Sequence, residues 1–294
     1  MNTKTNVIIL SLLVLGLLLL AGPVLAEEGL NPLSIKLSLG AGLSSDGDFG
    51  AFVNDFESFT SYLAAVTGLE KSGELEWPML GNALGAEFIW GVSNRFGLGL
   101  GVGSLTKSEK SALGLGLGPN LFIEGDLDFK LSSTALTLSA YYFRPLATRV
   151  AVILKGGPGY FWGRGQYVMS VLGSGENNTL NGDIKDRALG FQGSLGVEFK
   201  ISDHISLFAE GSGRLVKFSN WQGDETEVDN GAISTAVAAP VWHVTEDYSN
   251  LGVYYNSICL GQEPHNPALK DARRFEVDLS GIAFQLGVRI GFGR

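Results

Sequence analysis

Apolar residues alternate with glycine, serine or charged residues over long stretches of this chain, and this alternation constrains the fold more than any other feature. The clearest case is the stretch GIAFQLGVRIGF at residues 281–292, where every second residue from Ile282 to Phe292 is apolar. Successive side chains of a β-strand point to opposite faces, so a period of two predicts a strand with one apolar face.

Eight segments have this period. They cover residues 35–43, 84–92, 96–105, 134–143, 149–162, 189–199, 205–215 and 281–292. The connections at 93–95, 144–148 and 201–203 are short, whereas the other four gaps run to dozens of residues. Short turns at one end and long loops at the other are typical of membrane barrels. The sequence therefore predicts an all-β fold, an antiparallel up-and-down transmembrane β-barrel of eight strands. A further hairpin from ALGLGL (112–117) and DLDFKL (126–131) would make ten.

The composition agrees with membrane strands rather than membrane helices. Hydrophobic residues make up 45% of the chain, yet beyond the N-terminus no apolar run reaches the ~20 residues that a spanning helix needs. The net charge of −9 argues against a nucleic-acid partner, because phosphate binding needs a basic surface. The single cysteine, Cys259, leaves no disulfide within the chain.

The N-terminus has the order of residues of a secretory signal peptide. A polar start with Lys4 is followed by an apolar run at 7–20 and by AGPVLA at 21–26. Cleavage is predicted after Ala26, which gives a signal peptide, residues 1–26, and a barrel domain, residues 27–294. The alternative is an uncleaved membrane anchor.

Aromatic residues of the apolar face collect at the strand ends, where amphipathic rings settle at the two membrane interfaces. The predicted periplasmic girdle consists of Trp90, Phe96, Tyr142, Phe199 and Phe292. The predicted girdle at the opposite end consists of Tyr160 and Trp162.

The other face of the strands carries charge. It holds Lys36, Glu87, Lys155, Glu198, Glu210, Arg214 and Arg289, together with Gln192 and Gln285. Eight strands enclose an interior that side chains can fill, and an unpaired buried charge is strongly penalised. We therefore predict that these acids and bases pair in a polar plug. The alternative is a narrow ion path that opens when a pair rearranges.

The first long loop is predicted to contain an amphipathic helix. Its apolar residues Phe49, Phe52, Phe56, Phe59, Leu63 and Val66 recur every three or four positions. Asp46 or Asp48 would cap its start, and Gly68 follows its end. Such a helix could cover the barrel mouth, lie in the membrane interface or dock a partner.

The last long loop is acidic, and VWHV (241–244) with LGVYYNSICLG (251–261) could add short strands there. Carboxylate pairs such as Asp46/Asp48 and Asp224/Glu225 could hold Ca²⁺, but their spacing fits no EF-hand loop. No metal or other cofactor is predicted.

One set of residues would suit hydrolysis. His204, Ser206 and Glu210 lie on one strand face, loosely similar to the His/Ser/acid set of outer-membrane lipid A deacylases. However, His204 adjoins a predicted periplasmic turn, far from the outer leaflet, and the set faces inward. The chain is therefore predicted not to be an enzyme.

The C-terminal segment also carries a pattern seen in other proteins. Gln285, Gly287, Ile290 and Phe292 have the order of the assembly signal of outer-membrane barrels. With its eight segments, the chain resembles the small outer-membrane β-barrels (OmpA/OmpX-like, OmpW-like and opacity-type porin-like proteins). This resemblance implies the outer membrane of a Gram-negative-type bacterium, its assembly machinery as a partner, and contact with outer-membrane lipid and lipopolysaccharide.

The predicted function is a structural or surface-interaction role through long external loops, which would meet a surface ligand. The first alternative is a narrow, OmpW-like channel for small or apolar solutes. The second is an outer-membrane lipid-modifying enzyme.

Overall fold

The structure is a computed structural model that describes residues 31–116, 122–173, 176–248, 253–264 and 269–292. The predicted signal peptide lies outside these residues. Within them, no helix is long and apolar enough to cross a membrane.

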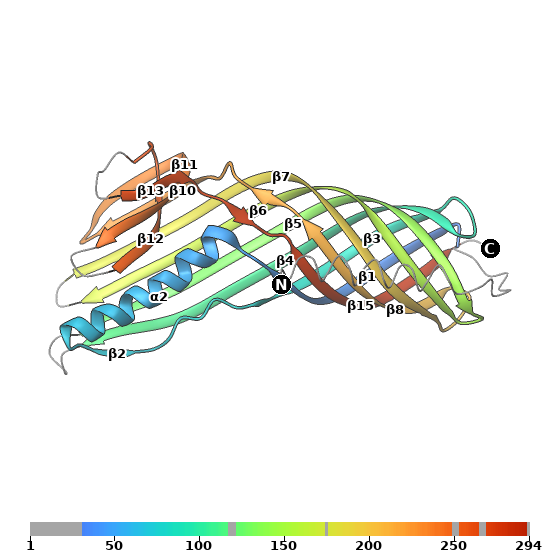
Figure 1. The fold of residues 1–294 in the computed structure, drawn as a ribbon, viewed down its shortest axis with the longest axis horizontal. Coiled ribbons are helices and arrows are strands. Elements are labelled where there is room, and N and C mark those ends of the chain that lie inside the picture. The colour runs from blue at the N-terminus through green and yellow to red at the C-terminus, as the bar shows by residue number, and fades with distance from the viewer. Residues whose placement is uncertain (1–30, 117–121, 174–175, 249–252, 265–268, 293–294) are drawn as a thin grey trace.

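Eight antiparallel strands form a ring, in the order β7-β6-β5-β4-β3-β1-β15-β8, and a further pairing of β7 with β8 closes it. The ring strands are β1 (Leu33–Ser44), β3 (Leu80–Gly91), β4 (Phe96–Gly116), β5 (Phe122–Ala147), β6 (Val150–Gly173), β7 (Glu176–Lys200), β8 (Ile205–Leu215) and β15 (Gly281–Phe292). Each of them overlaps one of the eight predicted segments. The all-β, up-and-down architecture is therefore confirmed (Figure 1).

Strands β4 to β7 are longer than predicted. They have 21 to 26 residues, and they project together beyond the ring at the left of Figure 1. The stretches ALGLGL and DLDFKL belong to these extensions, since Ala112 at the end of β4 pairs with Asp126 of β5. They do not form the additional hairpin that would have made ten strands.

The remaining strands lie in the long loops. They are β2 (Glu70–Ser72), β9 (Lys217–Phe218), β10 (Gln222–Asp229), β11 (Ala232–Tyr248), β12 (Val253–Leu260), β13 (Leu269–Arg274) and β14 (Val277–Asp278). β10 extends the sheet from the edge of β7, and β11 joins β10 to β12 and β13. The strands expected around VWHV and YYNSICL are thus β11 and β12.

The predicted helix is confirmed as α2 (Gly47–Thr67). Gly68 ends it in the left-handed conformation with φ 70°, as predicted, because glycine adopts that region without strain. Asp46 precedes the first turn but makes no side-chain capping bond; its carboxylate instead accepts hydrogen bonds from Trp77 Nε1 and Lys107 Nζ at 2.8 and 2.5 Å.

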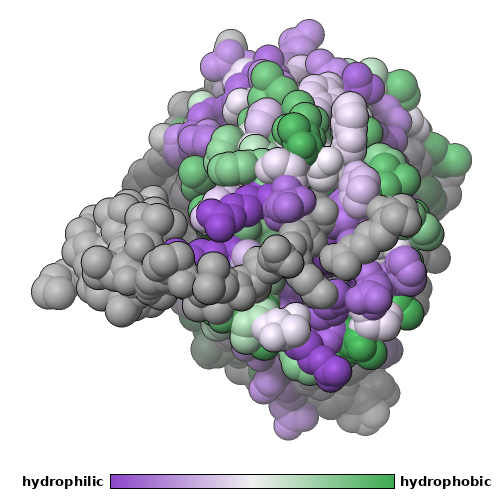
Figure 2. All heavy atoms as spheres, turned by 90° about the vertical axis from the view of Figure 1, so that its right-hand side faces the viewer, coloured by the Kyte–Doolittle hydropathy of each residue, from purple (hydrophilic) through white to green (hydrophobic). Residues whose placement is uncertain are grey.

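Large apolar side chains point outward from the ring and form an apolar belt. The belt includes Leu33, Ile35, Leu37 and Leu39 of β1, Leu84, Phe88 and Trp90 of β3, Phe96 to Val102 of β4, Leu136 and Leu138 of β5, Leu189 to Phe199 of β7, and Phe284, Leu286 and Phe292 of β15. We call the end with the short connections the turn end and the opposite end the cap end. Figure 2 looks onto the turn end, where apolar side chains lie on the flanks beside polar ones.

Candidate functional site

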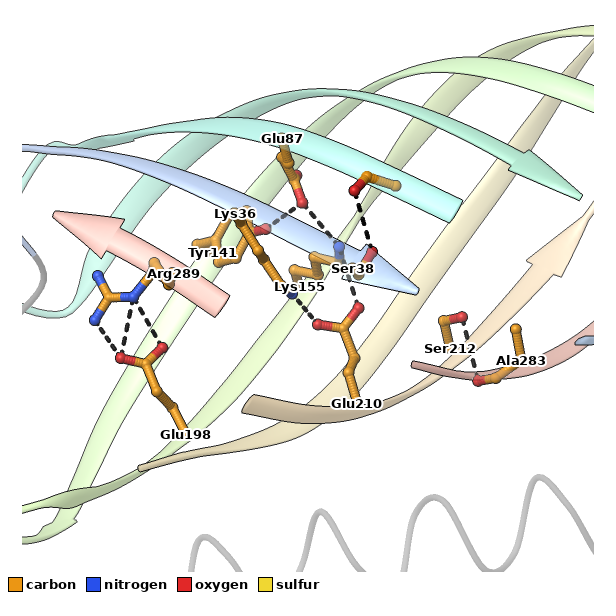
Figure 3. Close-up of polar contacts among 11 residues, drawn as sticks. Lys36, Ser38, Glu87, Tyr141, Lys155, Glu198, Glu210, Ser212, Ala283 and Arg289 are labelled. Atoms are coloured by element: carbon orange, nitrogen blue, oxygen red, sulfur yellow. Dashed lines mark hydrogen bonds and ion pairs between the residues drawn. The ribbon is translucent and has the colours of Figure 1, made fainter. Parts of the chain in front are cut away.

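The middle of the barrel interior holds a cluster of four charged side chains (Figure 3). Lys155 Nζ lies 2.8 Å from Glu87 Oε2 and 3.1 Å from Glu210 Oε1, and Lys36 forms an ion pair with the second oxygen of Glu210. The Tyr141 hydroxyl donates to Glu87. Two bases and two acids therefore neutralise one another, as a buried charge requires.

A second ion pair lies nearer the turn end. Arg289 Nε donates to both oxygens of Glu198 at 3.0 and 2.9 Å, and Nη2 makes a further hydrogen bond to the same carboxylate. Arg289 Nη1 donates to Ser34 at 3.2 Å, and the guanidinium lies 5.4 Å from the ring centre of Phe143. The pair is almost fully buried, with side-chain exposures of 8% and 3%.

Arg214 does not join these pairs. Its Nε donates to the carbonyl of Leu279 at 2.7 Å, and no carboxylate lies within ion-pair distance among the described residues. Asp46 is the acid whose charge acts on Arg214, but its carboxylate is already bound by Lys107 and Trp77. The alternation of side chains along β8 predicts that Arg214 points inward. It does not predict that the guanidinium binds a backbone carbonyl of the loop before β15 in place of a carboxylate.

Sequence analysis missed Tyr141, Ser34 and the buried pair Lys107–Asp46. Tyr141 has the inward parity of β5, and this was the available signal for it. Gly99 gives the cluster its space, because a Cβ there would lie 2.5 Å from Glu87 Oε1 and 2.7 Å from the Tyr141 ring.

A cavity of about 100 Å³ lies on the cap side of this cluster. Polar groups line its floor, including Lys36, Glu87 and Gln192, and Leu105 and Phe161 line it toward the cap. Glu87 Oε1 has no hydrogen-bond partner among the described residues, so water in the cavity would satisfy it.

Above the cavity the interior is apolar. A buried cluster, which we call the cap core, fills the space between the extended strands, α2 and the β9–β14 pair. It contains Phe49, Phe52, Val53, Leu75, Trp77, Leu113, Leu127, Phe129, Leu131, Phe161, Tyr167, Ile184, Val216, Phe218, Trp221, Val241, Phe275, Val277 and Leu279. Of the predicted helix face, Phe49 and Phe52 are buried here, whereas Val66 is exposed.

Polar contacts fasten α2 to this core. Arg273 of β13 donates to both oxygens of Asp48 at 2.6 and 2.7 Å, and Asn256 of β12 donates to Asp55 at 2.6 Å. The hydrogen bonds from Arg273 to Asp48 raise the pKa of the guanidinium. The helix thus packs over the barrel mouth, which is the first of the three placements expected for it.

All four carboxylates of the two pairs that could hold Ca²⁺ have partners within the protein. Asp46 binds Lys107, Asp48 binds Arg273, Glu225 accepts from Tyr167, and Asp224 accepts from the Ala238 amide. The described part of the chain contains no group of three or more His, Cys, Asp or Glu side chains that could hold a metal ion.

The candidate hydrolytic set does not assemble into a triad. His204 is exposed in the turn before β8, Ser206 is buried, and the carboxylate of Glu210 binds Lys36 and Lys155.

All seven girdle residues point outward. The rings of Phe96 and Tyr142 contact each other in a tilted arrangement with centres 5.3 Å apart, and Tyr160 meets Trp162 edge to face at 4.8 Å. The assembly signal stays a prediction. Within the fold, packing accounts for the glycine at position 287, because a Cβ there would clash with the carbonyl oxygen of Leu37.

The closed ring, polar interior and apolar belt define the outer-membrane β-barrel class. The family described as "Outer membrane protein beta-barrel domain" matches residues 12–239. The chain therefore belongs to this family.

Two solved structures are similar to this chain at low identity. OprG from Pseudomonas aeruginosa is 12% identical, with 91% of this chain and 98% of OprG covered at a TM-score of 0.39. A major outer membrane protein from Thermus thermophilus is 16% identical, with 88% and 99% covered at a TM-score of 0.39. No curated protein matches the chain.

Proposed function

We propose that this outer-membrane protein is a closed, non-enzymatic barrel with a structural or surface-contact role, exported by cleavage of a signal peptide after Ala26. The observation that carries the proposal is the double obstruction of the interior. The ion pairs of Lys36, Glu87, Lys155 and Glu210 fill one level, and the cap core fills the next. Two packed layers in succession support a barrel that is closed to ions.

The orientation follows from the class. Short turns lie in the periplasm and long loops outside, so the cap is the external surface. Its β10–β11 hairpin exposes the apolar side chains of Ile233 and Val237, which are 72% and 71% accessible. Apolar side chains exposed to water can mark a surface that contacts a partner. These side chains support a surface-contact role.

Single-channel recording tests the closed barrel. The refolded full chain in planar bilayers is expected to give no steady conductance, with an open porin in the same bilayers as the positive control. An Arg289→Ser/Glu198→Ser variant serves as a matched control, because it widens only the turn end and leaves the upper layers in place. Steady conductance by the wild-type protein would overturn the proposal in favour of a narrow channel.

A further inference from the structure

A groove of about 860 Å³ runs over the outer surface of β5, β6, β7 and β10, on the side of the wall away from the cap core. It begins where the apolar belt ends. Trp162 lines it, and Leu189, the last belt residue of β7, is followed toward the cap end by Arg187, which also lines it. The groove therefore lies at the level of the lipid headgroups in the leaflet facing the cap.

Strand register sets the side chains of the groove in two rows. In the first, Trp162 of β6 lies opposite Thr134 of β5 and Arg187 of β7. In the second, Arg164 of β6 lies opposite Lys185 of β7. Three cations are thus gathered just beyond the belt, beside an aromatic ring: Arg164 and Arg187 lie two residues from Trp162 and Leu189, and Lys185 lies two residues farther on β7.

Like charges directly opposite each other destabilise a sheet unless an anion lies between them. Asp183 partly fills that role for Arg164 and Lys185. Its two oxygens accept from Arg164 at 2.8 and 2.6 Å, and Lys185 Nζ lies 3.2 Å away. Hydrogen bonds from Arg164 lower the pKa of Asp183 below its ordinary value. One carboxylate therefore serves two cations.

Arg187 has no such partner. Its guanidinium forms no ion pair among the described residues. The carboxylate of the neighbouring Asp186 accepts instead from the backbone amides of Arg187 and Asn220 at 2.6 and 2.8 Å. Arg187 is exposed beside Trp162, at the edge of the belt. A cation in this position is suited to a phosphate.

The groove also offers acceptors and amides. Asp224, Asn220 and Gln222 line its far side, and Asp224 uses one oxygen to accept from Ala238, which leaves the other facing no donor among the described residues. Phosphate oxygens act mainly as acceptors at neutral pH, so the side-chain amides can donate to them but the Asp224 carboxylate cannot. Sugar hydroxyls both donate and accept, so they complement the mixed set.

We propose that this groove binds the phosphorylated saccharide headgroup of an outer-leaflet glycolipid. Arg164 and Arg187 hold a phosphate, Asp224 and the amides hold sugar hydroxyls, and Trp162 packs against the boundary between headgroup and acyl chains. The acyl chains of the lipid then lie along the apolar belt below. The site is independent of whether the barrel conducts.

The test is a lipid titration of the delipidated full chain in detergent, followed by native mass spectrometry. Diphosphoryl lipid A is expected to bind in a single saturable step, and monophosphoryl lipid A several-fold more weakly. The double variant R164Q/R187Q is expected to bind diphosphoryl lipid A with an affinity at least about tenfold lower, equivalent to about 1.4 kcal/mol. An unchanged shift of the protein band on heating before electrophoresis shows that the variant is folded.

Lys110→Gln is the matched control, because Lys110 is an outward cation on β4 that is paired with Asp128 and lies outside the groove. It should leave lipid A binding unchanged. The proposal is overturned if K110Q weakens binding as much as the double variant, or if the double variant binds like the wild type. Equal binding of phosphatidylglycerol would show a general attraction for anionic lipid and would also overturn it.

Discussion

Replacing Arg289 with methionine tests whether the interior charges are held by pairing. Arg289 supplies every hydrogen bond that the Glu198 carboxylate receives within the described structure, and Glu198 is 2% exposed. Methionine keeps much of the side-chain volume but leaves a buried carboxylate without a donor. Removal of one partner of a buried pair costs about 3–5 kcal/mol of unfolding free energy.

The local surroundings place the expected cost at the lower end of that range, about 3 kcal/mol. A hollow of about 40 Å³ borders Glu198 and Arg289 at the turn end, and a water molecule there can solvate part of the stranded carboxylate. The assay is urea unfolding of the full chain in lipid vesicles, followed by tryptophan fluorescence.

Two further variants make the result decisive. Arg289→Met/Glu198→Leu removes both charges and is expected to be closer in stability to the wild type than Arg289→Met alone. Lys110→Met breaks the exposed pair Lys110–Asp128, whose side chains are 78% and 39% accessible, and should cost less than about 1 kcal/mol. If Arg289→Met costs no more than Lys110→Met, the interior charges are not held by pairing.

Three other outcomes are expected. Phe129→Ala, at a fully buried position of the cap core, should cost about 3–5 kcal/mol in the same urea assay, whereas Ile233→Ala at an exposed position should cost less than about 0.5 kcal/mol. Burial raises the pKa of Glu225 above its ordinary value of 4.5. Between these two pKa values the folded protein keeps a proton on Glu225 that the unfolded chain releases. The stability that this proton gives is present at acidic pH and is lost as the pH rises from 4.5 through the folded pKa. Glu225→Gln should flatten that loss in unfolding curves measured from acidic to neutral pH; an unchanged slope would contradict it. Phe292→Ala should lower the fraction of protein assembled in the outer membrane, measured by resistance to SDS unfolding, while Phe292→Tyr should not.

The sequence was sufficient for the ring because each ring strand has a period of two, and the short connections pair the strands. It was also sufficient to place Lys36, Glu87 and Glu210 inside. It was not sufficient to pair them. Lys36 lies directly opposite Glu87 in the register of β1 and β3, yet its ammonium binds Glu210 of β8, and Lys155 of β6 takes Glu87. Contacts across the interior depend on ring curvature and side-chain length, which a single strand does not encode.

The ends of β4 to β7 were missed for a different reason. On β4, β5 and β7 the apolar face changes sides: outward Val102 gives way to inward Leu105 on β4, outward Leu136 to inward Leu131 and Phe129 on β5, and outward Leu189 to inward Ile184 on β7. A search for one continuous apolar face stops at that change.

The change of side has a physical cause. Beside the lipid the wall is apolar outside and polar inside, but beyond the membrane the outside is water and the inside is the dry cap core, so the same strand needs the opposite face. The inversion therefore locates the membrane boundary to within a few residues on each long strand. It also explains why cations stand directly above Trp162 and Leu189: outward positions beyond the inversion must be polar, and the first of them are the ones that meet lipid headgroups.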